Sequence, residues 1–406
     1  MPRSPILNLL VFVTPWSIFI TFVCPVLAVS SVNVQEDSKQ EDENLDTANA
    51  TSILEIRLND GKLLKGKLFL PQDAKAVKAL VVFVHGTGPG TYLNHRNSGS
   101  KTFNYFDYWG NELNQRGVAF FSYNKRGVTI SDQPPYYEKV DRDEFRKVVP
   151  HQDVDDLAVI VEQLKETPSL KDAKVSLLGA SEGTIIAAMC AEDHPDLIDA
   201  ILLFGYAHED MYDIIAWQHS GQASMINLNP VFDSDGDKTI SREEYESDDG
   251  EVAKYRQRVM QDSKFDLLDA NKDGELSAED FGLRLKTRQR ILMLNLKQGN
   301  EDWIWDYYFR ITVPWLQEHF SLEANKSRLT RLNLPIAIFH GERDANVPVE
   351  GVYDLEKRFR ALGKTNLKTF VFENHNHDLN FMEWVNNKKI PGGIEKVLEV
   401  AAESSR

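Results

Sequence analysis

The stretch Val175-Ser-Leu-Leu-Gly-Ala-Ser-Glu-Gly-Thr184 decides how this chain folds. Its aliphatic first half ends in Gly179-Ala-Ser-Glu-Gly183, and small and apolar residues follow as far as Cys190. This pattern predicts a buried strand that turns sharply into a helix, with Ser181 exposed at the tip of the turn. The first N–H groups of such a helix have no partner within it. A glycine-rich turn with an incidental serine would read the same way, because short motifs recur by chance.

Buried-strand runs alternate with helical runs along most of the chain. Strands with little apolar–polar alternation, separated by helices, are typical of an α/β fold with a mostly parallel sheet and helices on both faces. Right-handed crossovers place the carboxyl ends of such strands at one edge, where ligand sites form. Strands are predicted at 53–58, 63–70, 79–85, 118–123, from 175 to the turn, and at 200–204, 334–339 and 367–372. Helices are predicted at 103–115, 153–165, 184–190 and 393–403.

A glycine-rich loop, His85-Gly-Thr-Gly-Pro-Gly90, follows one of these strands. Such a loop can offer a backbone N–H to a developing oxyanion, and the N–H of Glu182 would be the second donor. The alternative is a phosphate-binding loop. No lysine follows as in a Walker loop, and the spacing is not G-x-G-x-x-G, so the oxyanion interpretation is favoured.

Two further polar stretches follow later strands. His340-Gly-Glu-Arg-Asp344 offers a carboxylate that could orient an imidazole, with Glu342 as a competitor and an ordinary turn aspartate as the alternative. Asn374-His-Asn-His-Asp-Leu379 offers two histidines, His375 and His377. Serine is a poor nucleophile until a base takes its proton and an acid orients that base, so the order Ser, Asp, His predicts a catalytic triad.

With these motifs the chain resembles the α/β-hydrolase superfamily, specifically its secreted or periplasmic esterase-like members. The resemblance covers about 54–205 and 334–403. It rests on His85-Gly-Thr-Gly-Pro89, Tyr123-Asn-Lys-Arg-Gly127, Gly179-Ala-Ser-Glu-Gly183, His340-Gly-Glu-Arg-Asp344 with Val347-Pro348, and Asn376-His-Asp-Leu379.

The resemblance implies a role for each matching position. Ser181 matches the nucleophile and Asp344 the acid, and His377 matches the base better than His375 does. The oxyanion donors match Thr87 and Glu182, with Gly86 as the nearby alternative. Thr184 departs from the pattern, because many relatives carry a second glycine there, and this puts close helix packing in doubt.

An insert at 207–333 stands where this fold usually carries an α-helical cap, and it contains paired EF-hand-like loops at 233–244 and 269–280. Oxygen-bearing side chains recur at the spacing of calcium ligands, although Asp280 replaces the usual final glutamate and Lys238 replaces the turn glycine of the first loop. Asn229-Pro230 makes a regular entering helix unexpected there. The predicted calcium ligands are Asp233, Asp235, Asp237, Thr239, Glu244, Asp269, Asn271, Asp273, Glu275 and Asp280.

A structural role for calcium, in rigidifying the cap, is favoured over a regulatory one, and no cofactor is expected for catalysis. The aromatic run 303–315 of the cap is expected to contribute part of its side chains to an acyl pocket and part to the core.

The N-terminal segment and the net charge indicate where the protein is located and which partners it can bind. Residues 1–28 resemble a cleaved signal peptide, with an uncleaved membrane anchor as the alternative, and 29–51 form an acidic linker. The core is then expected at 52–206 and 334–406. The protein is predicted to be exported, periplasmic or secreted, with membrane contact only through an anchor. With 46 Lys and Arg against 62 Asp and Glu, a net charge of −16 argues against a nucleic-acid partner.

The predicted function is therefore a serine hydrolase that cleaves small carboxylic esters through an acyl-enzyme, with calcium in its cap. A serine peptidase or amidase is the nearest alternative, because the same triad serves both reactions. A non-catalytic, calcium-dependent binding module is the alternative from another class.

Overall fold

The computed structural model describes residues 50–72 and 76–403 of the chain. The predicted signal peptide and all but the end of the acidic linker lie outside the described residues. Strand β1 begins at Ala50, so the last two residues of the predicted linker belong to the sheet. In the described part of the chain, no helix is both long and apolar enough to cross a membrane.

Eight strands form the central sheet, in the order β1-β2-β6-β3-β9-β10-β13-β14. Strands β1 and β2 pair antiparallel with each other and β2 with β6, while all later neighbours pair parallel. The predicted mostly parallel α/β sheet is confirmed. The strands are β1 (Ala50–Arg57), β2 (Leu63–Leu70), β3 (Ala79–Val84), β6 (Ala119–Tyr123), β9 (Lys174–Ala180), β10 (Ala200–Phe204), β13 (Ile336–Gly341) and β14 (Leu367–Phe372).

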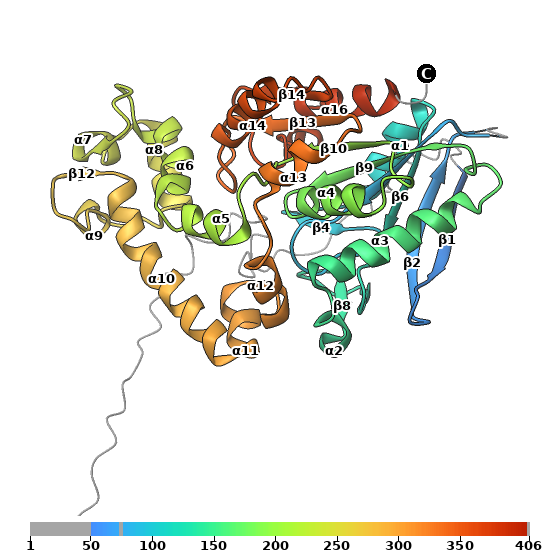
Figure 1. Ribbon diagram of the computed structural model, residues 1–406. Helices are drawn as coiled ribbons and strands as arrows, with labels where there is room; N and C mark the ends of the chain where they lie inside the picture. Colours follow the sequence, from blue (N-terminus) through green and yellow to red (C-terminus); the bar gives the residue numbers. More distant parts are fainter. Residues whose placement is uncertain (1–49, 73–75, 404–406) are drawn as a thin grey trace, which may run out of the picture.

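Helices cover both faces of this sheet (Figure 1). Side chains of one strand point alternately to opposite faces, so β3 places Val82 and Val84 in one core and Val81 and Phe83 in the other. The first core is covered by α3 (Pro150–Lys165), α4 (Gly183–Asp193) and α14 (Glu350–Ala361), and the second by α1 (Tyr105–Gln115), α15 (Met382–Asn387) and α16 (Gly392–Glu403).

Several elements differ from the sequence prediction. Residues 103–104 belong to a short hairpin strand, so the helix predicted from 103 begins at Tyr105. Two hairpins, the helix α2 (Arg142–Phe145) and the helix α14 were not predicted. The hairpin strands are β4 (His95–Ser98) with β5 (Lys101–Asn104), and β7 (Val128–Ile130) with β8 (Glu138–Val140).

A mostly helical segment connects β10 to β13 and extends beside the sheet, at the left of Figure 1. We call it the cap. Its helices are α5 (Met211–Gln218), α6 (Gln222–Phe232), α7 (Arg242–Tyr245), α8 (Gly250–Arg258), α9 (Phe265–Leu268), α10 (Ala278–Gln298), α11 (Glu301–Trp303), the π-helix η2 (Ile304–Tyr308), α12 (Val313–His319) and α13 (Asn325–Arg331).

The outer part of the cap has a hydrophobic core of its own, which includes Phe232, Ile240, Phe265, Leu276 and Phe281. Helix α6 continues through Pro230, contrary to the expectation of an irregular entrance to the first loop. Pro230 lies in the last turn of α6, and burial of neighbouring side chains in this core outweighs the one backbone hydrogen bond that proline cannot make.

The turn from β9 into α4 depends on very close backbone contact. A Cβ atom built on Gly183 would lie 2.2 Å from the carbonyl oxygen of Val84, and one built on Gly179 would lie 2.5 Å from the carbonyl oxygen of Gly183. The hydroxyl of Thr184 instead donates to the Ser181 carbonyl at 2.7 Å and accepts from the Ala207 N–H at 3.1 Å. The sequence analysis questioned close helix packing because Thr184 replaces a glycine. In the structure, Gly183 makes this close contact with β3 instead.

We expect Gly183→Ala to lower the free energy of unfolding by about 1–3 kcal/mol, because backbone atoms would have to move to admit the methyl group. Gly250→Ala is the matched control, since a Cβ atom there meets nothing within 4 Å. That control should stay within about 0.5 kcal/mol of the parent protein. Urea unfolding followed by tryptophan fluorescence measures both, and equal stabilities would contradict the argument.

Candidate active site

Ser181 lies directly after β9 with a φ of +56°, a backbone conformation that few residues other than glycine adopt. Its N–H donates to the carbonyl oxygen of Phe204, the last residue of β10, at 3.1 Å. Backbone strain of this kind is common where a side chain is held for chemistry. The turn therefore holds the Ser181 hydroxyl at the head of α4, at the carboxyl edge of the sheet.

Asp344 is buried in the turn after β13. One of its carboxylate oxygens accepts the N–H groups of Asn346 at 2.8 Å and Val347 at 3.0 Å. The other oxygen lies 2.7 Å from Nδ1 of His377. Glu342, the competing carboxylate, is exposed to solvent. Asp344 is therefore the acid that the structure pairs with an imidazole.

The two histidines of the loop after β14 have different surroundings. Nδ1 of His375 lies 2.9 Å from the Glu373 carbonyl oxygen, and its Nε2 accepts the Gly393 N–H at 3.3 Å. Both of its ring nitrogens thus contact backbone groups. A Cβ atom built on Gly205 would lie 2.6 Å from the His377 ring, so that ring packs against the residue that follows Phe204. This contact brings the His377 imidazole to the same end of β10 as Ser181.

The Asp344–His377 pair shifts the pKa of both groups. Burial alone would lower the pKa of His377, but the charge and hydrogen bond of Asp344 raise it above its ordinary value. Burial alone would raise the pKa of Asp344, but the charge and hydrogen bond of His377 lower it. An ionised carboxylate beside Nδ1 leaves Nε2 as the nitrogen that can exchange a proton with Ser181.

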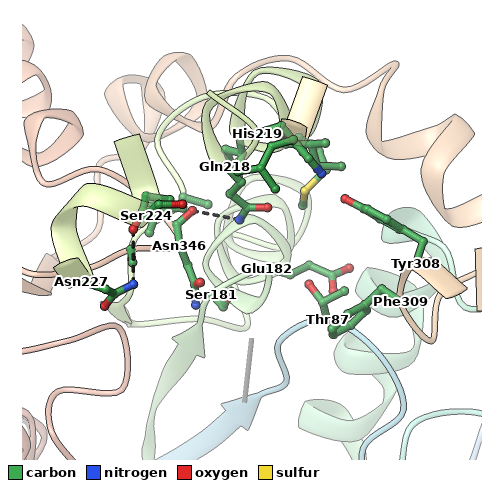
Figure 2. Close-up of a pocket in the computed structure, with 18 of the residues that line it drawn as sticks. Thr87, Ser181, Glu182, Gln218, His219, Ser224, Asn227, Tyr308, Phe309 and Asn346 are labelled. Carbon is green, nitrogen blue, oxygen red and sulfur yellow. Dashed lines mark hydrogen bonds between the residues drawn. The ribbon is translucent and has the colours of Figure 1, made fainter. Parts of the chain in front are cut away.

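The predicted oxyanion donors lie next to the serine. Thr87, Ser181 and Glu182 line one cavity (Figure 2). A Cβ atom built on Gly86 would lie 3.4 Å from the Cβ atom of Ser181, so the glycine-rich loop touches the turn. Within residues 50–72 and 76–403, no hydrogen bond from the backbone N–H of Thr87 or Glu182 is found. Thr87 and Glu182 therefore remain the candidates for the predicted oxyanion donors.

Sequence reasoning did not predict that two charged side chains, Glu182 and Lys125, are buried beside the site. The Glu182 carboxylate accepts Nε1–H of Trp315 at 2.7 Å and lies 2.8 Å from Nε2 of His319, both on α12 of the cap. Lys125, just after β6, is also buried and touches the glycine-rich loop. The sequence shows Glu182 inside the serine motif and Lys125 before Arg126-Gly127, but neither pattern indicates that the side chain is buried.

The cavity beside Ser181 lies under the cap and is lined mainly by apolar side chains from α5, α6, α8, α10 and α12. Of the aromatic run, Tyr308, Phe309 and Trp315 line it. Trp305 packs against Phe145 instead, and Tyr307 is exposed. The remaining polar lining includes Gln218, whose amide donates to the Asn346 carbonyl at 2.9 Å (Figure 2).

The two acidic loops of the cap lie side by side, because β11 (Ile240–Ser241) pairs antiparallel with β12 (Glu275–Leu276). In the first loop, carboxylate oxygens of Asp233, Asp235 and Asp237 lie within 4.8 Å of one another. Thr239 donates its hydroxyl to Asp237 at 2.9 Å, and the Glu244 carboxylate accepts the Ser234 N–H at 2.7 Å. Lys238 adopts a φ of +75°, as a residue at the turn-glycine position must.

The second loop repeats the hydrogen-bond pattern of the first. Asp269 accepts the Gly274 N–H at 3.1 Å with one oxygen, while its other oxygen is buried without a hydrogen-bond partner in the described structure. Asp280 is buried and accepts the N–H groups of Ala270 at 2.8 Å and Ser277 at 2.8 Å. Asn271, Asp273 and Glu275 lie between them along the loop, with the Asp273 carboxylate accepting the Glu275 N–H at 3.0 Å.

Comparisons with known proteins agree with this architecture. Residues 79–383 match the family model described as the alpha/beta hydrolase fold. No curated protein sequence matches the chain. Similar solved structures include a thermostable carboxyl esterase from Bacillus coagulans, which is 15% identical with a TM-score of 0.50, the match covering 88% of this chain and 99% of that one.

Two other similar structures are Est1E from Butyrivibrio proteoclasticus and an esterase from Exiguobacterium antarcticum. Est1E is 15% identical with a TM-score of 0.44, covering 87% of this chain and 98% of its own. The Exiguobacterium esterase is 15% identical with a TM-score of 0.42, covering 86% and 97%. At such identities the likeness to the Bacillus esterase is one of fold.

We expect Asp344→Asn to lower the pKa of His377, because it removes the carboxylate charge that opposes the effect of burial. Proton NMR titration of the His377 ring, assigned with His377→Gln, measures this shift. Glu342→Gln removes an exposed carboxylate two residues away and should leave the pKa of His377 unchanged. An unaltered His377 pKa in Asp344→Asn would disprove the pairing.

Proposed function

This chain belongs to the α/β-hydrolase family, and on that basis we propose that it is a serine hydrolase that cleaves carboxylic esters. The observation that carries the proposal is the 2.7 Å contact between Asp344 and His377, made beside the strained turn that bears Ser181. In this proposal Ser181 is the nucleophile, His377 the base and Asp344 the acid of a triad.

In the proposed reaction, Oγ of Ser181 attacks the ester carbonyl carbon while Nε2 of His377 takes its proton. The N–H groups of Thr87 and Glu182 stabilise the oxyanion of the tetrahedral intermediate. His377 then gives the proton to the departing alcohol, which leaves an acyl group on Ser181. A water molecule, deprotonated by His377, releases the acid and restores the serine. Asp344 stabilises the imidazolium in both halves.

A small ester suits the site better than a peptide. The cavity that reaches Ser181 lies beneath cap helices and is lined mainly by apolar side chains, which fit an acyl group. An extended peptide would need a groove with backbone partners on both sides of the scissile bond. Amides of small acids remain the nearest alternative because the same triad serves them.

We expect Ser181→Ala and His377→Gln each to lower kcat for p-nitrophenyl esters by at least about 1,000-fold, since nucleophile and base act as one unit. His375→Gln is the matched control, because His375 bonds only to backbone groups among the described residues. It should keep kcat within about threefold of the parent. Undiminished hydrolysis by Ser181→Ala would refute the proposed function. If the unaltered protein hydrolyses no ester, the result would favour the non-catalytic binding module.

We also propose that the paired acidic loops bind calcium. The residues fit the ion: Asp233, Asp235 and Asp237 converge, and the buried free oxygen of Asp269 calls for a cation. The other proposed ligands are Thr239, Glu244, Asn271, Asp273, Glu275 and Asp280. Calcium supplies no chemistry to the reaction in this proposal.

The proposed role of calcium is to rigidify the cap. Helix α6 ends at the first loop and places Leu228 in the cavity, while α10 begins at the second loop and places Leu285 there. Holding both helices therefore holds two walls of the acyl pocket. Export of the protein, which we propose from its leader-like first 28 residues, would bring these loops into calcium-rich surroundings.

We expect Asp233→Ala combined with Asp269→Ala to abolish the calcium heat in isothermal titration and the rise in Tm on adding calcium. Glu243→Ala combined with Glu279→Ala is the matched control. It removes the same charge from the eleventh position of each loop, whose side chain is not a ligand in this pattern. Equal calcium binding by the two double variants would show that general negative charge, and not a ligand set, attracts the ion.

A further inference from the structure

Lys125 is a buried cation that the reaction above does not use. It follows β6, is 3% exposed, and its ammonium group has two contacts. It lies 3.3 Å from a carboxylate oxygen of Asp153 and donates to the carbonyl oxygen of Gly86 at 3.1 Å. Burying an ammonium group is costly unless it is paired, so each contact limits where the group can lie.

The contact with Gly86 reaches the glycine-rich loop at a specific peptide unit. The carbonyl of Gly86 and the N–H of Thr87 belong to the same planar peptide and point in opposite directions. Fixing that carbonyl therefore also fixes the direction of the Thr87 N–H. The positive charge on the carbonyl side further polarises the peptide, which makes the N–H a stronger donor.

The second donor is held from the other side of the site. Glu182 is buried, and its carboxylate contacts Trp315 and His319 on cap helix α12. Burial alone would raise the pKa of Glu182, but the Lys125 ammonium and the donors from α12 lower it to about 2. Burial alone would lower the pKa of Lys125, but the carboxylates of Asp153 and Glu182 raise it. Both shifts favour the charged forms of the two side chains.

We propose that Lys125 and Glu182 are positioning residues for the two oxyanion-hole donors. Lys125 orients the Gly86–Thr87 peptide, and the Glu182 side chain anchors its own backbone N–H to the cap through α12. The opposite charges of the two side chains also attract each other. This inference rests on the proposed serine hydrolase function and explains how its transition state is stabilised.

The neighbouring residue Arg126 is a buried cation without hydrogen bonds to the proposed oxyanion donors in the part of the chain that the structure describes, and it can be compared with Lys125. Its guanidinium is as buried as Lys125 and pairs with Asp156 at 2.7 Å and Asp60 at 2.5 Å. Among the described residues, the hydrogen-bond partners of its side chain include no group of the glycine-rich loop or the serine turn. Arg126→Met therefore removes a buried, paired cation one residue away and serves as the matched control.

A positioning role predicts a specific change in the kinetic constants. The oxyanion exists only in the transition state and the tetrahedral intermediate, so misplaced donors lower kcat and leave substrate binding almost unchanged. A merely structural role would instead lower stability, with kcat of the folded fraction preserved. The affinity for an alkyl boronic acid, which forms a tetrahedral adduct on serine, should follow kcat.

The experiment compares four variants with the parent protein. Three are the single variants Lys125→Met, Glu182→Gln and Arg126→Met, and the fourth is a double variant that combines Lys125→Met and Asp153→Asn. For p-nitrophenyl esters, we expect Lys125→Met, Glu182→Gln and the double variant to lower kcat by about 10-fold to 100-fold with little change in KM. Their affinity for the boronic acid should fall by the same factor. Arg126→Met should lower Tm but keep kcat within about threefold. The double variant removes both charges of one pair, so it is the safeguard against misfolding.

The outcomes separate this inference from the function on which it rests. An unaltered protein that neither hydrolyses esters nor reacts with a fluorophosphonate would overturn both. If the unaltered protein is active, a folded Lys125→Met with unchanged kcat and boronate affinity would overturn the inference alone. Equal losses of kcat in Lys125→Met and Arg126→Met would do the same, because they would show a general effect of removing a buried cation.

Discussion

The backbone contact between Gly183 and the carbonyl of Val84 is the constraint on which the rest of the site depends. A side chain at position 183 would push α4 away from β3, since even a methyl group would come within 2.2 Å of that oxygen. With no side chain there, the helix begins against the strand, and the serine turn meets the glycine-rich loop that follows β3. Ser181, the proposed nucleophile, then lies against the loop that carries Thr87, one of the proposed oxyanion donors.

Charges taken out of water organise the remainder of the site. Asp344, Glu182 and Lys125 are all buried, and each has a partner of opposite charge or a set of donors around it. Such groups stabilise a fold little, but they tolerate few arrangements because an unpaired buried charge is very costly. Since Trp315 and His319 come from the cap, the cap takes part in holding the centre as well as covering it.

Sequence reasoning succeeded where the physics is local. Continuous aliphatic runs identified the strands, and the motifs at their ends identified Ser181, Asp344 and His377 as the residues that the fold brings to one edge. It failed where packing decides. The hairpins at 95–104 and 128–140 have strands of only three or four residues, too short to show a clear pattern. Helix α6 passes through Pro230 because its apolar side chains fill the core of the cap.

The sequence by itself determined the kind of sheet, the turn at Ser181 and the spacing of oxygen-bearing residues in the two acidic loops, because these follow from hydrophobic pattern and backbone sterics within a few residues. Only the tertiary structure decided which histidine faces Asp344 and which aromatic residues of the cap reach the cavity. It also decided that Lys125 is buried against the Gly86 carbonyl and that the Glu182 carboxylate is buried against α12. Those outcomes depend on distances and on the exclusion of water between segments far apart in the chain, and no local pattern records either.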